Sequence, residues 1–286
     1  MKNKKNLLKR MFLIAAITIL VLGVSNICIN AIYTKKIPHS YASAEDGREL
    51  LFANTEYYDN FTQNDIDFRL KKSDGTLDEL LDISTGEISD FNFIEKYIID
   101  RRIAQMARTL QKNGYELPQI EEIVFVKTDM TVEMGASGYT HKTEIYLNST
   151  NIMVSLIPGA GEYFDKLLRH ELFHCLTRCN PEFREQMYAL IHFTVADSDY
   201  ELPPCVQDYC NTTALIPIDG TDTYYVPEQA SNFDDVFGTN TGYVIDPEEC
   251  MADNFAFAML YGEAGKNNQG YSNPEIIQGI IDIMSR

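Results

Sequence analysis

The sequence predicts an α+β fold, because segments with helical periodicity and short strand-like segments occupy separate stretches of its 286 residues. A long amphipathic segment comes first, two short strand-like segments follow, and the later helical segments are separated by a long loop. The length is typical of one large domain or two small ones. With 45% hydrophobic and 23% charged residues, the chain can bury a sizeable core, which excludes wholesale disorder and fibrous repeats.

The N-terminal segment, residues 1–34, predicts export. Five Lys and Arg residues precede an uncharged stretch, whose most apolar part, residues 11–24, suits the core of a signal peptide. The whole uncharged stretch is long enough to cross a bilayer, so a signal peptide cleaved after Ala31 and a retained signal anchor both stay open. In either case the basic residues stay on the cytoplasmic side. We therefore expect the body to be extracellular, either secreted or anchored to the outer face of the cytoplasmic membrane.

The charge of the chain is distributed unevenly. Residues 1–36 hold seven of the 24 Lys and Arg residues and none of the 42 acidic residues. A body this acidic would repel phosphate backbones, and no basic stripe compensates for it, so nucleic acid is excluded as a partner. Contact with a membrane is expected only through the N-terminal segment, if that segment is not cleaved.

Five cysteines remain in the body, an odd number that leaves at least one thiol free or paired with another chain. Cys175 and Cys179 lie one turn apart on an expected helix, and the spacing of Cys205 and Cys210 fits no zinc knuckle. We therefore expect these residues to be core cysteines or disulfides rather than zinc ligands.

The body begins with residues 35–48, which show no apolar periodicity and are expected to be a polar spacer. Residues 49–90 are expected to be the N-terminal part of the body or a pro-region, with one short helix near residues 78–83. A long helix is predicted over residues 91–113, because apolar residues recur near period 3.6 from its first turn and Gly114 ends it.

The remaining elements follow from strand alternation and from the signals that begin and end helices. Asn180 and Pro181 end one helix and open the next, with Asn180 as the N-cap. Asp246 and Pro247 begin the last predicted helix, which Gly262 stops. In order, these elements are strands at residues 121–127 and 143–148, the second expected at an edge, helices at 163–177 and from 181, a loop-rich stretch at 196–245, and a helix at 246–261.

The chemistry of the chain is carried by HELFH, which runs from His170 to His174. On a helix, residues four positions apart share a face, so both imidazoles can reach one metal ion. Glu171 can approach a water molecule at that ion as the general base. The other positions of this helix form an apolar stripe, and two histidines with a glutamate on the remaining face are an odd composition for a mere core helix.

A catalytic zinc site usually has a third protein ligand. The best source is the segment DPEECMADNFA, in which Glu249 and Asp253 lie one turn apart on the same face. One of them could bind the metal while the other holds an imidazole by its second nitrogen. Glu248 is the alternative third ligand. Two further histidines are weaker candidates: His141, near the expected edge strand, and His192, for which a partly buried structural role is expected.

HELFH followed by ExxADxFA resembles the gluzincin branch of the zincin metallopeptidases, and the segments NPEFR and PEExxADNFA are similar to those of uncharacterised exported bacterial HExxH proteins. The resemblance implies a zincin-like domain with an HExxH helix, a small sheet whose edge strand lies beside the cleft, and a C-terminal helix that carries the third ligand. The edge strand, which pairs with extended substrate, is implied within residues 138–148. The residues implied are as follows: a metallopeptidase domain over 91–286, His170, His174 and Glu249 as ligands of one Zn²⁺ per chain, Glu171 as the base, and Asp253 as support for His170.

The resemblance implies an exported zinc-dependent metallopeptidase that hydrolyses peptide bonds in peptide or protein substrates. Glu171 would take a proton from the attacking water and pass it to the leaving amine. Tyr243, six residues before Glu249, is expected to donate a hydrogen bond to the oxyanion, with Tyr224 and Tyr225 as rivals. His174 and Glu249 are 75 residues apart, more than in compact members, so an intervening loop or subdomain is required and the choice between Glu248 and Glu249 stays open.

Two other functions stay open. The chain could be a non-catalytic cell-surface binding module that retains the fold, although loss of Glu171 would then be the simplest change to expect. It could also be a structural or adhesion domain in which the HExxH motif is accidental, and analysis of bound metal would distinguish this case. Structural calcium is an option in the acidic loop at residues 219–235, but no EF-hand spacing occurs there.

Overall fold

The structure is a computed structural model that describes residues 30–54, 58, 61–196, 224–227, 237–244, 246–268 and 270–285. Most of the expected export segment, Cys205, Cys210, and the acidic loop apart from residues 224–227 lie outside these ranges. Within them, no helix combines the length and the apolar character needed to cross a bilayer.

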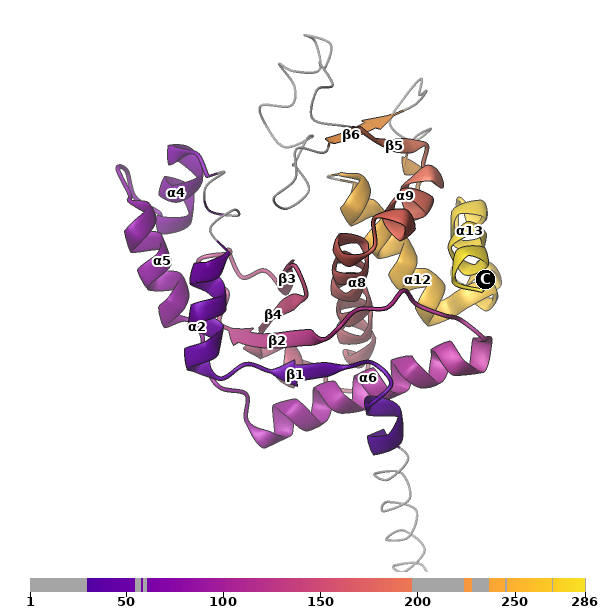
Figure 1. Ribbon diagram of the computed structural model, residues 1–286, viewed down its shortest axis with the longest axis horizontal. Helices are drawn as coiled ribbons and strands as arrows, with labels where there is room; N and C mark the ends of the chain where they lie inside the picture. The colour runs from indigo at the N-terminus through magenta and orange to yellow at the C-terminus, as the bar shows by residue number, and fades with distance from the viewer. Residues whose placement is uncertain are drawn as a thin grey trace, which may run out of the picture.

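The described residues form an α+β fold around a mixed four-stranded sheet, as the sequence predicts (Figure 1). Helices α2, α4 and α5 lie on one side of the sheet in this view, and α8, α9, α12 and α13 lie on the other. The elements are β1 (His39–Tyr41), α2 (Ala44–Ala53), α4 (Gln63–Leu70), α5 (Leu77–Gly86), α6 (Phe93–Asn113), β2 (Ile123–Thr128), β3 (Gly138–His141), β4 (Glu144–Asn148), α7 (Ser149–Val154), α8 (Gly161–Cys179), α9 (Pro181–Ala189), β5 (Phe193–Ala196), β6 (Tyr224–Pro227), α12 (Pro247–Asn268) and α13 (Pro274–Met284).

The strands of the main sheet lie in the order β1-β2-β4-β3. β1, β2 and β4 are parallel. β3 runs antiparallel to β4, and the tight turn that joins them contains Lys142, which has a φ of 50°. The prediction that residues 143–148 form an edge strand is therefore wrong, because β4 lies between β2 and β3. The edge strand of this stretch is β3, which packs against α8.

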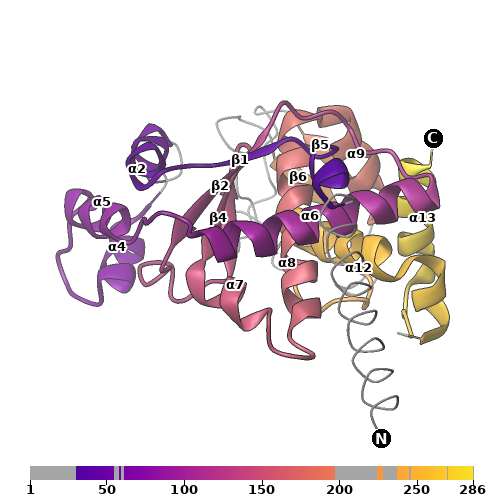
Figure 2. The ribbon, with the colours of Figure 1, turned by 90° about the horizontal axis from the view of Figure 1, so that it is seen from below.

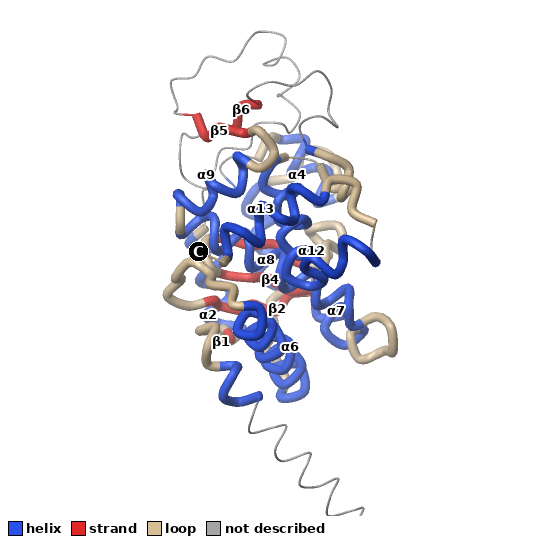
Figure 3. Tube along the Cα trace, turned by 90° about the vertical axis from the view of Figure 1, so that its right-hand side faces the viewer, coloured by secondary structure: helices blue, strands red, loops and turns tan. Residues whose placement is uncertain are grey.

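The two faces of the sheet pack against different helices. Alternate side chains of a strand point to opposite faces, so Phe125 and Ile145 enter one core while Val126 and Tyr146 enter the other. The larger core joins the sheet to α6, α8, α9, α12 and α13, and the smaller one joins it to α2, α4 and α5. Figure 2 shows α6 running across the sheet, and Figure 3 shows the strands lying among the helices. This arrangement fixes α8 between the sheet and α12.

The long helix α6 occurs where it is predicted, but its first turn is oriented differently. Its buried face contains Ile99 and Ile103, whereas Phe93, Ile94 and Tyr97 are exposed. Phe93 and Ile99 are six positions apart, a rotation of about 240° around a helix, so both cannot face the core. The prediction that the apolar face begins in the first turn is therefore wrong.

Several elements lie where the sequence analysis expects none. β1 lies inside the expected polar spacer and pairs in parallel with β2, and α2 begins in the same segment. A helix of only a few turns, or a strand as short as β1, is too brief to show a period. The stretch 78–83 is helical as predicted, within α5, and α4 and α7 are additional helices. The helix that begins after Asp246 is not the last one, because α13 follows it.

The ends of the helices follow the predicted signals in part. Asp246 caps α12, since its Oδ1 accepts a hydrogen bond of 2.8 Å from the backbone N–H of Glu249. Helical geometry breaks at Gly262, where φ is 53°, as predicted. Asn180 precedes α9 but does not cap it with its side chain, which instead donates to the Leu176 carbonyl at 3.0 Å.

The cysteines of the described ranges are thiols. Cys175 and Cys250 are buried in the larger core, as expected, and Cys179 is exposed. All three are free, so the one-turn pair on α8 forms neither a disulfide nor a metal site among the described residues.

Candidate metal centre

Helix α8 presents His170 and His174 on one face, one turn apart. The helix has no interior glycine or proline after Gly161, and its apolar residues Phe164 and Leu168 hold it in the core. Both histidines are buried, with exposed fractions of 9% and 4%. Two buried imidazoles with this spacing converge on one point beside the helix.

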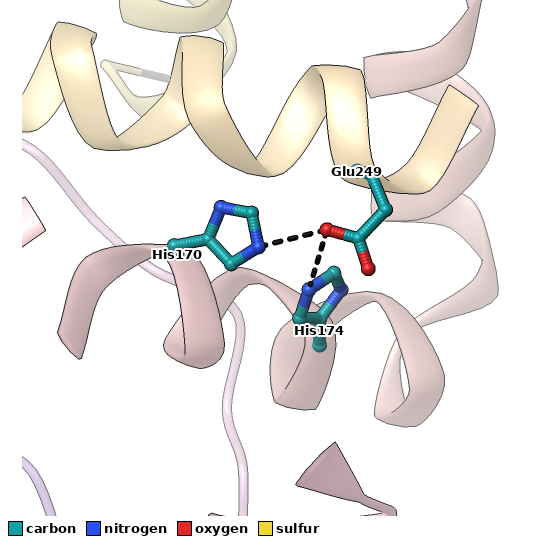
Figure 4. A group of neighbouring side chains, drawn as sticks. All are labelled: His170, His174 and Glu249. Carbon is teal, nitrogen blue, oxygen red and sulfur yellow. Dashed lines mark hydrogen bonds and ion pairs between the residues drawn. The ribbon is translucent and has the colours of Figure 1, made fainter. Parts of the chain in front are cut away.

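Glu249 on α12 meets both imidazoles. Its Oε2 lies 2.9 Å from Nε2 of His170 and 3.7 Å from Nε2 of His174 (Figure 4). One nitrogen or oxygen from each of these three residues lies within 4.8 Å of the others. Two imidazole nitrogens and one carboxylate oxygen at these separations could hold a metal ion, and this donor set is one that catalytic zinc takes in proteins.

A different carboxylate holds the second nitrogen of each imidazole. Nδ1 of His170 lies 3.0 Å from Oδ1 of Asp253, and Nδ1 of His174 lies 2.8 Å from Oε1 of Glu248. Such hydrogen bonds fix the orientation of a ring and leave its Nε2 to face an ion. The structure thus brings Asp253 to the outer nitrogen of His170 and Glu248 to the outer nitrogen of His174.

Both supporting carboxylates have further partners that the sequence analysis does not include. Asp253 accepts hydrogen bonds from Lys166 Nζ at 2.8 Å and from Thr241 Oγ1 at 2.6 Å. Glu248 accepts from Thr177 Oγ1 at 2.6 Å and from the hydroxyl of Tyr188 on α9. Lys166 and Thr177, the two donors on α8, each stand one turn from a histidine. This helical spacing is the one sequence signal that could have indicated them.

The charges of this cluster oppose the effect of burial. Burial lowers the pKa of His170, but its hydrogen bonds to Asp253 and Glu249 outweigh burial and raise the pKa to about 9. Burial also opposes the charged form of His174, yet the charge of Glu249 and the bond to Glu248 raise its pKa well above the ordinary value. For Glu249, burial raises the pKa, and the charge of His174 outweighs it, so the pKa is lowered. The site therefore favours ionised carboxylates beside positive charge.

Glu171 is 3% exposed and lies between the histidines and strand β3. A Cβ atom added to Gly138 of β3 would stand 3.0 Å from its Oε1. Its Oε2 has no hydrogen-bond partner within the described part of the chain. Burial raises the pKa of this carboxyl, while the charges of His170 and His174 oppose the rise. A buried carboxylate with a free oxygen is suited to accept a proton.

Tyr243 lies beside the histidines, with its ring centroid 5.9 Å from that of His170 and 42% of the residue exposed. Tyr224 and Tyr225 belong to β6, and their side chains lie outside the description. His141 is buried on β3 against the rings of Tyr139 and Tyr146, and it does not belong to the ligand group. His192 is exposed in a turn with a φ of 63°, so the expectation that it is partly buried is wrong. Neither residue joins the candidate ligands, although His141 lines the cavity beside them.

A cavity of about 630 Å³ opens over the site. One wall is the stretch from Ala136 to His141, which includes β3, and another is the face of α8 that carries the histidines. Tyr243 and Glu249 also line it. The three candidate ligands and Glu171 therefore face a space that can admit a ligand of small-molecule or peptide size.

Gly138 provides a test of the close approach between β3 and Glu171. We expect Gly138→Ala to reduce any hydrolytic activity by about tenfold or more, because the added Cβ would also stand 3.2 Å from a backbone carbonyl of β4 and would push Glu171 from its position. Bound metal should stay unchanged, since the glycine does not contact the histidines. Gly86→Ala is the matched control, because a Cβ there meets nothing within 4 Å. Equal activity in the two variants would contradict the prediction.

The chain matches no family model, no curated protein and no solved structure. The resemblance to gluzincins therefore stays a prediction carried by the motif. The case for a metal site depends on the positions of His170, His174 and Glu249 themselves.

Proposed function

We propose that this chain is an exported zinc-dependent metallopeptidase that hydrolyses peptide bonds. The observation that carries the proposal is that Nε2 of His170, Nε2 of His174 and Oε2 of Glu249 lie together beside the buried, unpaired carboxylate of Glu171. Four such groups that face one cavity make up the ligand set and the base of a metal-dependent hydrolase. A structural metal site would need neither the cavity nor the additional carboxylate.

The residues present fit one zinc ion per chain. Neutral imidazole nitrogens and a carboxylate oxygen are ordinary zinc ligands, and three protein ligands leave a position for water. His170, His174 and Glu249 would hold the ion, while Asp253 and Glu248 would hold the rings. When bound, zinc supplies Lewis acidity and lowers the pKa of water at the site.

Glu171 would act as the general base. Its Oε2 is free to accept the proton of the attacking water, and the same carboxyl can then deliver that proton to the leaving amine. Burial favours the protonated form of this carboxyl, which makes it a competent acid in the second step. Tyr243, whose ring lies beside that of His170, would donate a hydrogen bond from its hydroxyl to the developing oxyanion.

Strand β3 would align the substrate. It pairs with β4 on one side only among the described strands, and it lines the cavity beside Glu171. An extended peptide can add to such an edge through main-chain hydrogen bonds, which places a peptide carbonyl near the metal position. The substrate is therefore a peptide or an unfolded segment of a protein outside the cell. The acidic body argues against nucleic acid as a partner, and we propose contact with the membrane only through the N-terminal segment, if that segment is not cleaved.

Metal removal tests the proposed function directly. The full-length chain should carry one zinc per molecule by elemental analysis and should cleave a pool of unstructured peptides. A chelator should abolish cleavage and lower the Tm, and added zinc should restore both, because free zinc at about 100 times Kd stabilises a folded protein by about 2.7 kcal/mol. A chain that retains no zinc after reloading and removal of the excess would contradict the proposal. A chain that holds zinc and cleaves nothing would indicate the non-catalytic binding module instead.

A further inference from the structure

Arg184 on α9 is a buried cation at the cavity that the proposed mechanism does not use. The residue is 8% exposed, and it lines the cavity together with His174 and Thr177. Its backbone continues α9 normally, with its N–H bonded to the Asn180 carbonyl at 3.0 Å. Its long side chain therefore reaches the cavity from a regular helix, which holds the guanidinium in a defined place.

The guanidinium of Arg184 has no hydrogen bond or ion pair within the described part of the chain, and its buried Nε lacks a partner. Three other arginines, on α6 and α8, differ because a terminal nitrogen of each has a protein partner. Arg102 lies 2.7 Å from Asp165, Arg169 donates to the Asp165 carbonyl at 2.7 Å, and Arg178 donates to Thr140 on β3. Arginine is almost never buried unless it is paired, because removing the charge from water is costly. A buried guanidinium that faces a cavity without a protein partner therefore indicates an anionic ligand.

Nearby carboxylates do not meet this need. Glu248 is the carboxylate bonded to Tyr188, which stands one turn after Arg184 on α9. Its oxygens already accept hydrogen bonds from His174, Thr177 and Tyr188, so it is not paired with Arg184. Among the described residues, no carboxylate is therefore paired with Arg184, which leaves its guanidinium available to an anionic ligand.

We propose that Arg184 forms a subsite that binds a carboxylate of the substrate. The inference rests on the proposed peptidase function, since it takes the ligand of the cavity to be a peptide. The planar guanidinium matches a carboxylate with two parallel hydrogen bonds. A peptide offers that group from two sources, its own C-terminus or an Asp or Glu side chain. The first source would restrict cleavage to sites near the end of a chain, and the second would select acidic sequences anywhere along it.

The test separates binding from catalysis. Zinc-loaded Glu171→Gln protein is incubated with a pool of N-acetylated random hexapeptides, in which each sequence occurs as the free acid and as the C-terminal amide, and the retained peptides are identified by mass spectrometry. The same selection is made with the double variant that adds Arg184→Gln. We expect peptides with a carboxylate to be enriched by the first protein and to lose about 10- to 100-fold of that enrichment in the second.

The pool distinguishes the two sources. Preference for the free acid over the amide of the same sequence would assign the C-terminus, and preference for Asp and Glu over Asn and Gln would assign a side chain. Arg184→Lys should retain part of the preference, because lysine keeps the charge but not the two parallel donors. Zinc content and Tm should not fall in Arg184→Gln, because an unpaired charge is removed. If that variant does not fold, Arg184→Lys provides the comparison, with a severalfold loss expected.

Several outcomes would overturn the subsite. Among them are an enrichment that Arg184→Gln leaves unchanged, an equal loss for charged and neutral peptides, and a preference that Arg178→Gln abolishes instead. Retention of no carboxylate-bearing peptide by the zinc-loaded protein would also overturn it. Hydrolysis of the pool by the wild type is measured separately, so cleavage without a carboxylate preference would refute the subsite alone. Selective capture without any cleavage by the wild type would refute the peptidase alone.

Discussion

Glu171→Gln is expected to lower the rate of peptide hydrolysis by roughly 10²- to 10⁴-fold while zinc remains bound. Glutamine has the same shape and can still pack against Gly138 of β3, but it cannot accept the proton of the attacking water. The zinc content should stay at one per chain, because the structure places Glu171 outside the group formed by His170, His174 and Glu249. The measurement is kcat with a cleaved peptide, alongside elemental analysis.

The matched control is Glu185→Gln on α9, an exposed glutamate that should change neither quantity. The Tm of Glu171→Gln should not fall, since a carboxyl whose pKa is raised by burial loses nothing when an amide replaces it. A loss of zinc in this variant would mean that Glu171 is a ligand or a structural group. An unchanged kcat would assign the role of base to another residue.

The local part of the site can be predicted from the sequence because it depends on helix geometry alone. His170 and His174 share a face of α8 because they are four positions apart, and the apolar stripe of α8 fixes the direction in which that face points. Glu249 and Asp253 are likewise one turn apart, so both reach the site once α12 lies along α8. Both members of each pair therefore reach the site once the two helices pack against each other.

The distant part could not be predicted, because it depends on where the chain returns. Tyr188 meets Glu248 through the packing of α9, and Gly138 meets Glu171 through the sheet. Neither pair has a spacing that a period can show. The same reason explains why β1 could not be recognised, since its three residues acquire a partner only in the sheet. By contrast, α13 has apolar residues at helical spacing after Pro274, a signal that was readable.

The fold also decides which face of a predicted helix is buried. The isoleucines of α6 could be assigned to its core face from their spacing, but its first turn carries apolar residues that remain exposed. α6 packs against the rest of the larger core on one side only, so apolar residues on the other side of its first turn stay exposed. An apolar pattern thus predicts that a helix is amphipathic more securely than it predicts where the contact ends.

The last prediction concerns the choice between two adjacent glutamates. We expect Glu249→Ala to weaken zinc binding by more than about 100-fold, whereas Glu248→Ala and Asp253→Ala should each weaken it by about 10- to 100-fold, as loss of a group that orients a histidine does. Glu248 already accepts from His174, Thr177 and Tyr188, so its oxygens are occupied. Oε2 of Glu249 instead faces the inner nitrogens of both histidines.

Competition of each variant with a chelator of known zinc affinity measures all three changes on one scale. Glu248→Ala and Asp253→Ala are matched, because each removes one carboxylate from the Nδ1 of one histidine. Their losses should therefore be similar, and that of Glu249→Ala should exceed both. If Glu248→Ala causes the largest loss, Glu248 rather than Glu249 is the third ligand, and Glu249 is held beside the site for another purpose. Equal losses in all three variants would mean that zinc is held only by general attraction to the negative charges of the cluster. That outcome is incompatible with a defined catalytic centre.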